Sequence, residues 1–475
     1  MPINSFLYPG AKTTPGYEVA NSCRFNSDAY MVKNIVTPTN QKKYTISVWV
    51  KRSVISSRQR IFTAIDTSDT AAYSYLEFQS DDRLNFDDFD GSSTRLTRTT
   101  NRKFRDPSAW INIIIAVDTT LSSASSRVKM YINGTEETDF ASTSNASQDF
   151  NTTTLNSSKT FRIAEHGTAG FRFGGYMCEF VLIDGSQLDQ TSFGEFDSDS
   201  PNIWKPIDVS GLTFGNNGFY LDFEDSSNLG NDANGGTDFT ETSLAATDQS
   251  TDTCTNNFAT LNPIYHYIDS ATLSEGNIKF TTSGNSSKGR AISTIRPESG
   301  KWYIEFKVID STRFQCGVMN GNETNSAQGG SDANSFVFGY GGDFYFNGSL
   351  YEAYTSDLSD NDIVQLALDL DNDLFWFGVN DTWGNSATRT EIENGTATNS
   401  GSTDIGSQVP VNTGAIGIFL EDNSGTGNNV AEINFGSPSF SISSGNSDAN
   451  GYGNFEYAVP SGFYALNSKN LAEFG

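Results

Sequence analysis

The chain has 475 residues, a formal net charge of −27, two histidines and four cysteines. Its 43 glycines and 35 phenylalanines, among many Ser, Thr, Asn and Asp residues, favour turns and strands over helices. The length predicts more than one domain, since all-β domains reach about 200 residues. The acidic charge argues against nucleic acid as a partner, because phosphate binding needs clustered Lys and Arg residues.

Two short basic stretches, residues 51–60 and 95–105, are candidates for phosphate binding, but acidic residues flank them. We therefore expect no nucleic-acid partner. No window approaches eighteen apolar residues, and the N-terminus lacks a basic region followed by a long apolar stretch. We expect neither membrane insertion nor a signal peptide.

Residues 1–205 predict a first domain of about eight short strands, identified from period-two alternation and from apolar runs bounded by turn residues. Polar turns separate these strands, and no segment has convincing helical periodicity, which is typical of a β-sandwich or jelly roll. The predicted strands are 44–52, 60–66, 74–80, 83–89, 110–118, 127–134, 160–165 and 174–184.

Residues 185 to about 270 differ from both flanks, because turn residues dominate and only 218–223 predict a clear strand. A disordered linker is normally poor in aromatic residues. This segment is not, and we predict that residues 206–270 form an extended, ordered arm whose aromatic side chains pack against the adjoining sandwich or a neighbouring subunit. The aromatic residues in question are Phe193, Trp204, Phe214, Phe219, Phe223, Phe239 and Phe258.

Residues 271–475 predict a second sandwich of the same style. The fold class expected for the chain is therefore all-β, with two antiparallel jelly-roll or β-sandwich domains joined by the aromatic-rich arm. The predicted strands are 277–283, 300–310, 313–320, 335–341, 343–351, 362–371, 374–380, 415–422 and 431–437.

One pattern occurs in both domains. Residues 111–137 read INIIIAVDTTLSSASSRVKMYINGTEE, and residues 363–383 read IVQLALDLDNDLFWFGVNDTW. Each is an apolar strand ending in Asp, a polar turn and a second strand, followed by Asn-Gly in the first case and Asn-Asp in the second. The pattern predicts a central hairpin in each domain.

These segments carry two resemblances. YTISVWVKRS, SAWINIIIAVDTT and RVKMYINGTEE resemble the opening core strand and the central hairpin of laminin-G-like, concanavalin-type jelly rolls. SGKWYIEFKV and DIVQLALDLDNDLFWFGVND resemble the early strand and the hairpin of SPRY-type domains, which commonly end that hairpin in Asn-Gly; Asp381 stands here in place of the Gly. Both resemblances imply two-sheet antiparallel sandwiches.

The middle of the chain is the most specific part. GYMCEFVLIDGSQLDQTSFGEFD, NGFYLDFEDSSNLGNDANG and DTCTNNFATLNP resemble segments of large structural proteins of tailed bacteriophages, notably marine ones, and Cys254 replaces a Pro of that pattern. The ending VPSGFYALNSKNL is similar to their C-termini. This resemblance implies a tail-fibre or virion-surface protein that is assembled in the host cytoplasm. Its partners would be capsid or tail proteins and further copies of itself, with a trimer first.

Catalytic chemistry has little support in the sequence. Glycanases of the concanavalin-type fold carry a Glu-x-Asp-x-x-Glu strand, which is absent here. We interpret the acids of YLEFQSDD (Glu77, Asp81 and Asp82) and of CEFVLID (Glu179 and Asp184) as ordinary strand-end acids. The only histidines, His166 and His266, lie in no recognisable nucleophile setting. We expect no enzymatic activity and no catalytic residue.

A cofactor has little support either. Asp369, Asp371 and Asp373 have the spacing that begins an EF-hand loop, but the Gly at position six and the Glu at position twelve are missing. A tight hairpin turn is the stronger interpretation, and no His/Cys cluster suits zinc. We expect no cofactor, while Ca²⁺ held by backbone carbonyls and scattered Asp residues is left open.

Aromatic residues near loops of the second domain are the candidates for ligand binding. Aromatic faces stack on the C–H surfaces of sugars, and neighbouring Asn or Asp side chains can bind the hydroxyls; the alternative is that these rings fill the second core. The leading hypothesis is a non-enzymatic virion protein that adheres to host-surface glycans. The alternatives are a capsid decoration or cement protein without a ligand, and a glycan depolymerase. The candidate ligand-binding residues are Tyr340, Tyr345, Tyr351, Tyr354 and Trp383.

Overall fold

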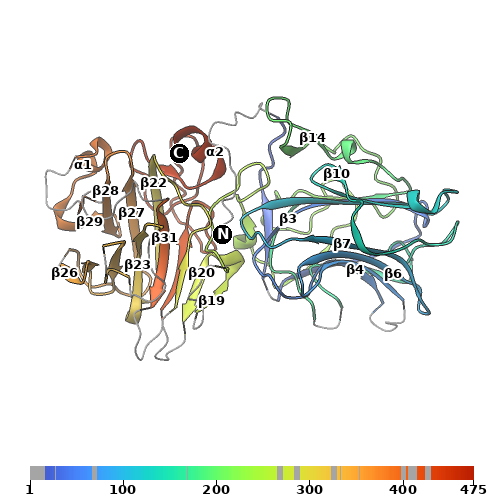
Figure 1. Ribbon diagram of the computed structural model, residues 1–475, viewed down its shortest axis with the longest axis horizontal. Helices are drawn as coiled ribbons and strands as arrows, with labels where there is room; N and C mark the ends of the chain where they lie inside the picture. The colour runs from blue at the N-terminus through green and yellow to red at the C-terminus, as the bar shows by residue number, and fades with distance from the viewer. Residues whose placement is uncertain are drawn as a thin grey trace. The chain divides into compact units, whose positions relative to one another are not determined.

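The chain forms two compact units, which are seen in Figure 1. The described residues up to Thr255 make up the first unit, and those from Asn256 onward make up the second. The segment predicted as a connecting arm, residues 206–270, therefore divides between the two units. The computed structural model describes residues 16–26, 28–66, 72–167, 170–264, 271–282, 289–321, 329–331, 333–351, 354–396, 403–404, 415–422 and 429–475.

Two antiparallel sheets form the first unit (Figure 1). Sheet A runs in the order β10 (Thr135–Glu136), β9 (Val128–Ile132), β8 (Trp110–Asp118), β3 (Lys43–Arg52), β13 (Gly175–Asp184), β1 (Ser22–Phe25) and β18 (Gln249–Ser250), and β16 (Phe219–Leu221) also pairs with β13. Sheet B runs in the order β11 (Phe140–Ser144), β7 (Thr94–Lys103), β6 (Arg83–Phe89), β5 (Tyr73–Phe78), β4 (Gln59–Ile65), β12 (Thr160–Ile163), β2 (Tyr30–Asn34) and β17 (Thr240–Thr242). The hairpin of β14 (Gly194–Phe196) and β15 (Trp204–Pro206) and the 3-10 turns Ala124–Ser126, Gln190–Ser192 and Ala246–Asp248 also belong to this unit.

The two sheets of the first unit differ in how their outer faces are covered. Every residue of β8 and β13 is buried, which matches their long apolar runs. The outer side chains of sheet A, such as Ile114 and Val181, pack against Phe193, Val209 and Phe214 from the segment that follows β13. In sheet B, by contrast, Leu76 and Phe78 of β5 enter the core, whereas the alternate residues of the strand are polar or aromatic and face outward.

The aromatic residues of the predicted arm are buried in the units to which they belong. Phe219, Phe223 and Phe239 lie in the main core of the first unit, and Phe258 lies in a cluster of the second unit. Strands β16, β17 and β18 extend both sheets of the first unit with residues from this segment. The segment is therefore an integral part of the two folds in the residues that the structure describes.

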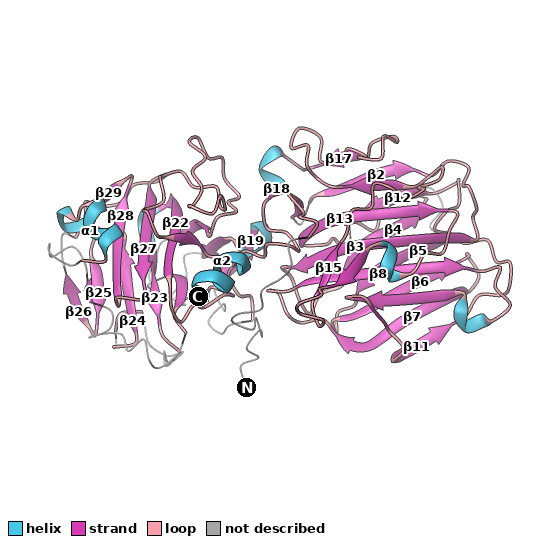
Figure 2. Ribbon diagram, turned by 90° about the horizontal axis from the view of Figure 1, so that it is seen from above, coloured by secondary structure: helices cyan, strands magenta, loops and turns pink. Residues whose placement is uncertain are grey.

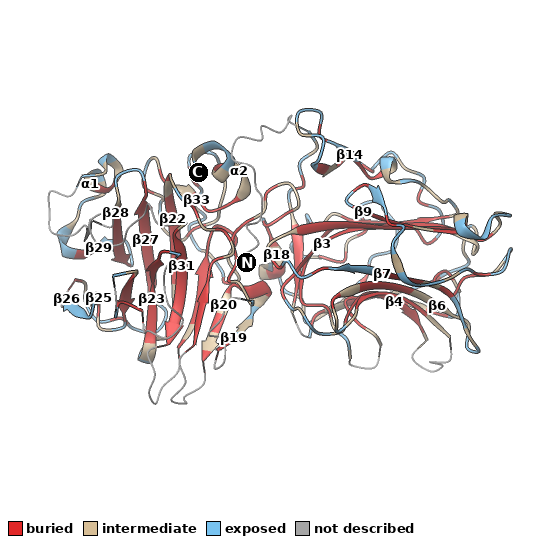
Figure 3. Ribbon diagram, in the orientation of Figure 1, coloured by how far each residue is buried: buried red, intermediate tan, exposed pale blue. Residues whose placement is uncertain are grey.

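The second unit is also a two-sheet sandwich, coloured by secondary structure in Figure 2 and by burial in Figure 3. Sheet C runs in the order β19 (Ala271–Ser274), β20 (Lys279–Thr282), β32 (Val430–Asn434), β22 (Lys301–Asp310), β27 (Ile363–Asp369), β28 (Leu374–Val379) and β29 (Thr382–Trp383), with β30 (Thr403–Asp404) beside β28 and β33 (Tyr464–Ala465) parallel to β22. Sheet D runs in the order β21 (Arg290–Ile292), β31 (Gly417–Asp422), β23 (Phe314–Met319), β24 (Ser335–Gly339), β25 (Phe344–Phe346) and β26 (Ser349–Tyr351). The 3-10 turns are Glu275–Asn277, Ser311–Arg313 and Gly384–Ser386.

Both predicted central hairpins form. Strands β8 and β9 pair in the first unit, and β27 and β28 pair in the second. Each hairpin then turns into a further short strand through two residues with positive φ, Asn133-Gly134 in one and Asn380-Asp381 in the other. Asp381 thus adopts the left-handed conformation for which Asn and Gly are usually selected.

Three features depart from the sequence predictions. The predicted strand 343–351 is a hairpin, because Asn347 and Gly348 both have positive φ and separate β25 from β26. The basic stretch 95–105 lies largely in β7, an unpredicted strand that pairs with β6 and β11. Two short helices, which no predicted element covers, also occur among the described residues of the second unit, while the fold class stays all-β as expected.

The helices are short but well capped. Helix α1 (Arg389–Asn394) begins after Thr388, which exchanges hydrogen bonds with Glu391, and ends at Gly395 with a φ of 60°. Helix α2 (Ser468–Phe474) follows Asn467, whose side chain accepts from the Asn470 backbone N–H. Six and seven residues are too few to show helical periodicity in the sequence. Among the described residues, none of the helices has the length and apolar character needed to span a membrane.

Candidate ligand-binding face

The predicted ligand-binding aromatics of the second unit have different environments. Tyr340 is 44% exposed, and Tyr345 is half-buried against the outer face of sheet D. Tyr354 and Trp383 are buried, with 4% and 8% exposure, in two hydrophobic clusters of the unit. Tyr351 ends β26, and its side chain lies outside the described residues. The ring of Tyr354 therefore fills the main core of the second unit, that of Trp383 packs in a separate hydrophobic cluster, and Tyr340 presents an open ring.

Aromatic and charged side chains gather instead on the outer face of sheet B in the first unit. Cross-strand register aligns them in rows, since residues directly opposite each other share a face. We define the outer face of sheet B by three such rows and by the adjoining Arg58, His166 and Phe171. The rows are Arg162, Thr63, Tyr75, Asp87 and Thr97; Arg60, Glu77, Asn85 and Thr99; and Ile65, Tyr73, Phe89 and Thr94.

Glu77 is the centre of the charge network on this face. Its two oxygens each accept from Arg58 Nε at 2.9 Å, and Oε2 lies 2.6 Å from Arg60 Nε. The Arg60 guanidinium also lies over the Tyr75 ring, 3.4 Å from the ring centroid. Two arginines thus neutralise one buried carboxylate and hold an aromatic ring in place.

A chain of hydrogen bonds continues across the neighbouring strands. The Tyr75 hydroxyl donates to Asp87 Oδ2 at 2.7 Å, and Asn85 Nδ2 donates to the same oxygen at 3.0 Å. Thr99 Oγ1 donates to Asn85 Oδ1 at 2.7 Å. Burial next to the Asp87 carboxylate raises the pKa of Tyr75, so its hydroxyl stays protonated and donates at neutral pH.

Aromatic rings form a connected series on the same face. Tyr73 stacks on Phe89 at 5.1 Å and on Tyr75 at 5.6 Å, and its edge meets His166 at 6.5 Å. His166 in turn contacts Phe171, which is 39% exposed. Burial, together with the positive charges of Arg60 and Arg58, lowers the pKa of His166 to about 4, so the imidazole is neutral at physiological pH.

Phe171 is held in an unusual backbone conformation. Its φ of 58° lies in the left-handed region, which costs free energy for a residue with a bulky side chain. The Arg58 guanidinium lies 4.6 Å from the centroid of the Phe171 ring, and the backbone carbonyl of Phe171 accepts from the Arg60 backbone N–H. The surrounding structure therefore fixes an exposed ring at the edge of the outer face of sheet B.

Several polar atoms of this face have no hydrogen-bond partner among the described residues. They are Arg60 Nη1, Thr63 Oγ1, Asp87 Oδ1 and His166 Nδ1, and both Arg60 and Thr63 are at most 2% exposed. Buried polar groups nearly always have a partner, which water or a ligand supplies when the protein does not. Four buried polar atoms beside the stacked rings, on Arg60, Thr63, Asp87 and His166, thus have no partner among the described side chains.

The carboxylates of the face are engaged by neighbouring side chains. A retaining glycosidase needs two carboxyl groups about 5 Å apart, one of which acts as a nucleophile. Glu77 is tied to two arginines, and Asp87 accepts from Tyr75 and Asn85. The sequence interpretation of Glu77 as an ordinary strand-end acid missed this network, although the alternation of aromatic and charged residues in YSYLEF and RLNFDDF carries its signal.

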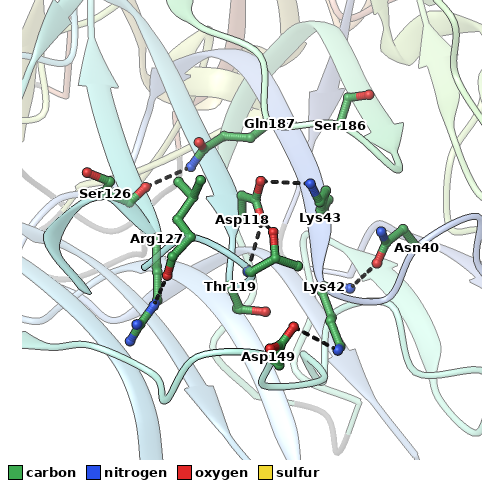
Figure 4. Close-up of polar contacts among 12 residues, drawn as sticks. Asn40, Lys42, Lys43, Asp118, Thr119, Ser126, Arg127, Asp149, Ser186 and Gln187 are labelled. Carbon is green, nitrogen blue, oxygen red and sulfur yellow. Dashed lines mark hydrogen bonds and ion pairs between the residues drawn. The ribbon is translucent and has the colours of Figure 1, made fainter. Parts of the chain in front are cut away.

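A second polar cluster of the first unit, drawn in Figure 4, is made of matched pairs at the ends of β3 and β8. Lys43 Nζ lies 3.0 Å from Asp118 Oδ2, and Lys42 Nζ lies 3.1 Å from Asp149 Oδ1. Gln187 Nε2 donates to the backbone carbonyls of Ala116 and Ser126. The cluster therefore anchors the segment that follows β13 to the rim of sheet A.

The segment with EF-hand-like spacing forms a hairpin turn between β27 and β28, which is the interpretation that the sequence favoured. Asp369 accepts from Lys301 Nζ at 2.8 Å and from the Asn372 backbone, and Asp371 accepts from the Gly300 backbone N–H. Asp373 has a φ of 56° and directly precedes β28. The structure brings no three His, Cys, Asp or Glu side chains together for a metal within the described ranges, and His266 lies outside those ranges.

Comparison with known proteins matches the first unit to a fold family. Residues 25–189 match the model described as the Concanavalin A-like lectin/glucanases superfamily. No curated protein matches the chain. The predicted all-β class is thus confirmed, with a laminin G and concanavalin-like sandwich in the first unit.

Three solved structures illustrate the similarity. Domains LG4-5 of the mouse laminin alpha1 chain share 10% identity, with 91% of this chain and 93% of that chain covered and a TM-score of 0.30. The SPRY domain of human HERC1 shares 15% identity over 34% of this chain and 91% of its own, with a TM-score of 0.26. A SAP-like pentraxin from Limulus polyphemus shares 14% identity, with 37% of this chain and 76% of that chain covered and a TM-score of 0.26.

Proposed function

We propose that this chain is a non-enzymatic structural protein of a tailed-bacteriophage virion that adheres to host-surface glycans through the outer face of sheet B. It is displayed as a tail fibre, an appendage or a capsid fibre. The observation that carries the adhesive role is the series of stacked rings on this face, which ends in the exposed ring of Phe171 and lies beside charged and polar side chains. Saccharides need both features, because their C–H surfaces stack on rings while their hydroxyls need fixed donors and acceptors.

The virion role is supported by the sequence resemblance of the middle and C-terminal segments to tailed-bacteriophage structural proteins. Those segments are built into the two folds: β16, β17 and β18 complete the sheets of the first unit, and the residues near the C-terminus form α2 and β33 of the second. Two sandwich units with few helices also suit a displayed protein, whose loops and sheet faces contact partners while the cores stay rigid. A homotrimer is the assembly we propose for a fibre.

The absence of enzymatic activity belongs to the same proposal. Among the described residues of the outer face of sheet B, Glu77 is engaged by two arginines and Asp87 Oδ2 by tyrosine and asparagine, an arrangement that does not suit an acid and nucleophile pair. Incubation of the chain with host capsular or cell-wall polysaccharide is expected to release no reducing ends. Release that is lost on changing a carboxylate would favour the depolymerase alternative.

Removal of one ring from the face is expected to weaken glycan binding about tenfold, or about 1.4 kcal/mol. The variants are Tyr73→Ala and Phe171→Ala, because Tyr73 joins three other rings and Phe171 is the exposed end of the series. The measurement is a glycan array with the full chain, followed by titration calorimetry on the best-binding oligosaccharide.

Two further exposed aromatics serve as matched controls for this experiment. Phe196 is 45% exposed in β14, within the first unit but away from sheet B, and Tyr340 is the exposed candidate of the second unit. Phe196→Ala and Tyr340→Ala are expected to leave glycan affinity unchanged. A loss confined to Tyr340→Ala would move the site to the second unit, as the sequence predicted.

The cement alternative is distinguished by location on the particle. Cryo-electron microscopy of intact virions is expected to place the chain on a fibre or appendage with the outer face of sheet B accessible. A chain packed into the capsid shell, with that face covered by shell protein and no hit on the array, would support the decoration or cement role in place of adhesion.

A further inference from the structure

A cavity of about 390 Å³ lies on the other side of the first unit, next to β16 and sheet A. Its size falls within the range of small-molecule sites. Three aromatic residues, Tyr17, Phe214 and Tyr220, line it together with three carboxylates, Asp208, Asp222 and Glu224. Phe214 and Tyr220 are 4% and 6% exposed, whereas Asp208 and Glu224 are exposed at the rim.

The two tyrosine rings at this cavity are fixed by a chain of hydrogen bonds that leads to a buried carboxyl group. The hydroxyls of Tyr17 and Tyr220 lie 2.9 Å apart, and the Tyr220 hydroxyl lies 2.9 Å from both oxygens of Glu179. Glu179 sits in the middle of β13, not at a strand end as the sequence interpretation had it. Its φ of 50° falls where the register between Cys178 and Val181 shifts. A bulge of this kind redirects a side chain, and here it aims the carboxyl at Tyr220.

The charged side chains that line the cavity are all acidic. No Lys, Arg or His belongs to its lining in the described part of the chain. Burial, followed by the charge of Glu179 and with smaller contributions from Asp208 and Glu224, raises the pKa of Tyr17 to about 12. Hydrogen bonds from Ser210 lower the pKa of Asp208, which keeps that carboxylate ionised. The space therefore combines negative charge at the rim with the negative faces of aromatic rings.

A bare metal ion does not suit this arrangement. A calcium ion needs six to eight oxygens at about 2.3–2.6 Å, and the described carboxylates gather nowhere in the chain closely enough for one. The three acids instead surround a space several times larger than an ion. An organic cation has the size to touch rings and carboxylates at once.

We propose that this cavity binds an organic ammonium group, either a quaternary ammonium or the protonated amine of an amino sugar. The rings of Tyr17, Phe214 and Tyr220 supply cation–π contacts, and Asp208, Asp222 and Glu224 supply the compensating charge. Glu179 is a positioning residue, because it holds the Tyr220 hydroxyl and does not itself line the cavity. This site is independent of the proposed glycan-binding face on sheet B.

Titration calorimetry on the full chain at low salt tests the charge requirement with matched probes. Choline is compared with its neutral isostere 3,3-dimethylbutan-1-ol, and glucosamine is compared with glucose. Each cation is expected to bind about tenfold more tightly than its neutral counterpart, and the difference is expected to shrink as salt is raised. The pair with the larger difference identifies the source of the ammonium group.

Variants of the rim test the location. Asp208→Asn and Glu224→Gln change exposed side chains, and each is expected to weaken choline or glucosamine binding about fivefold while the thermal midpoint stays unchanged. Glu136→Gln is the matched control, since Glu136 is an exposed carboxylate of the same unit that pairs with Lys129. Equal affinity for cation and isostere, absence of binding by every ammonium probe at millimolar concentration, or unchanged binding in both rim variants would each overturn the proposal. None of these results bears on the glycan array.

Discussion

Asp252→Ala is expected to destabilise the first unit by about 3–5 kcal/mol, the cost of removing one partner of a buried ion pair. Lys51 Nζ lies 2.6 Å from Asp252 Oδ2, and both side chains are 1% exposed. Trp110 Nε1 also donates to Asp252 Oδ1 at 3.0 Å. The variant leaves a buried ammonium without its counter-charge and an indole N–H without its acceptor.

Differential scanning calorimetry provides the measurement, because a loss of this size lowers the midpoint of a unit of this length by about 10 °C. Burial already lowers the pKa of Lys51, and removing Asp252 lowers it further. The difference in stability between the native chain and the variant is therefore expected to shrink as pH rises and Lys51 loses its proton.

The control is Asp149→Ala, which breaks the exposed pair with Lys42 shown in Figure 4. The side chains of Lys42 and Asp149 are 31% and 58% exposed, and such pairs contribute at most about 1 kcal/mol. If Asp252→Ala shifted the midpoint no more than Asp149→Ala does, the Lys51–Asp252 pair would not hold the segment that follows β18 to sheet A.

Glu179→Gln is expected to remove a pH dependence of stability that amounts to about 3 kcal/mol between pH 5 and 8. Burial raises the pKa of Glu179 from 4.5 to about 8, and the charges of Asp222 and Glu224 act in the same direction. The fold thus favours the neutral carboxyl. This stabilisation is complete below pH 4.5 and is lost as pH rises through 8. Gln keeps the shape of the side chain and does not titrate. The variant should therefore lose less stability than the native chain as pH rises from 5 to 8.

Midpoints of thermal unfolding at pH 5, 6, 7 and 8 test this expectation as the difference between the native chain and the variant. The difference is needed because burial also raises the pKa of Asp88 to about 7, which adds a pH dependence common to both proteins. Curves that run parallel across the four pH values would show that Glu179 titrates near its ordinary pKa. Glu136→Gln, at an exposed position, should give the native curve.

Strands whose residues alternate between apolar and polar, or are apolar throughout, were predictable from the sequence. Such local patterns show which faces of a strand are buried. The run INIIIAV predicts a strand with both faces covered, and β8 is buried along its whole length. The Asn-Gly and Asn-Asp turns likewise follow from residues that accept positive φ. Strand β7 escaped prediction, because its Arg and Thr residues suggest a solvated basic surface unless acidic neighbours pair with them. In the structure Arg95 pairs with Asp90, and Arg102 pairs with Glu137.

The candidate sites were less predictable, since each depends on residues that are far apart in the chain. Tyr340, Tyr345, Tyr354 and Trp383 stand near predicted loops, yet local sequence does not distinguish an open ring from one that completes a core, and Tyr354 and Trp383 are buried. The outer face of sheet B joins five strands by register, which depends on long-range pairing. Glu179 and Tyr220 are 41 residues apart and meet only because β16 pairs with β13 beside a bulge.

The sequence by itself determined the all-β class, the presence of two sandwiches, their central hairpins and an aromatic-rich segment that had to be buried. These properties follow from composition and from the two-residue period of a strand, which are local. Only the tertiary structure decided that residues 206–255 complete the first unit, that sheet A is covered while sheet B keeps a polar outer face, and that three carboxylates surround an aromatic cavity. Those features arise from pairings across tens to hundreds of residues, which no local pattern encodes.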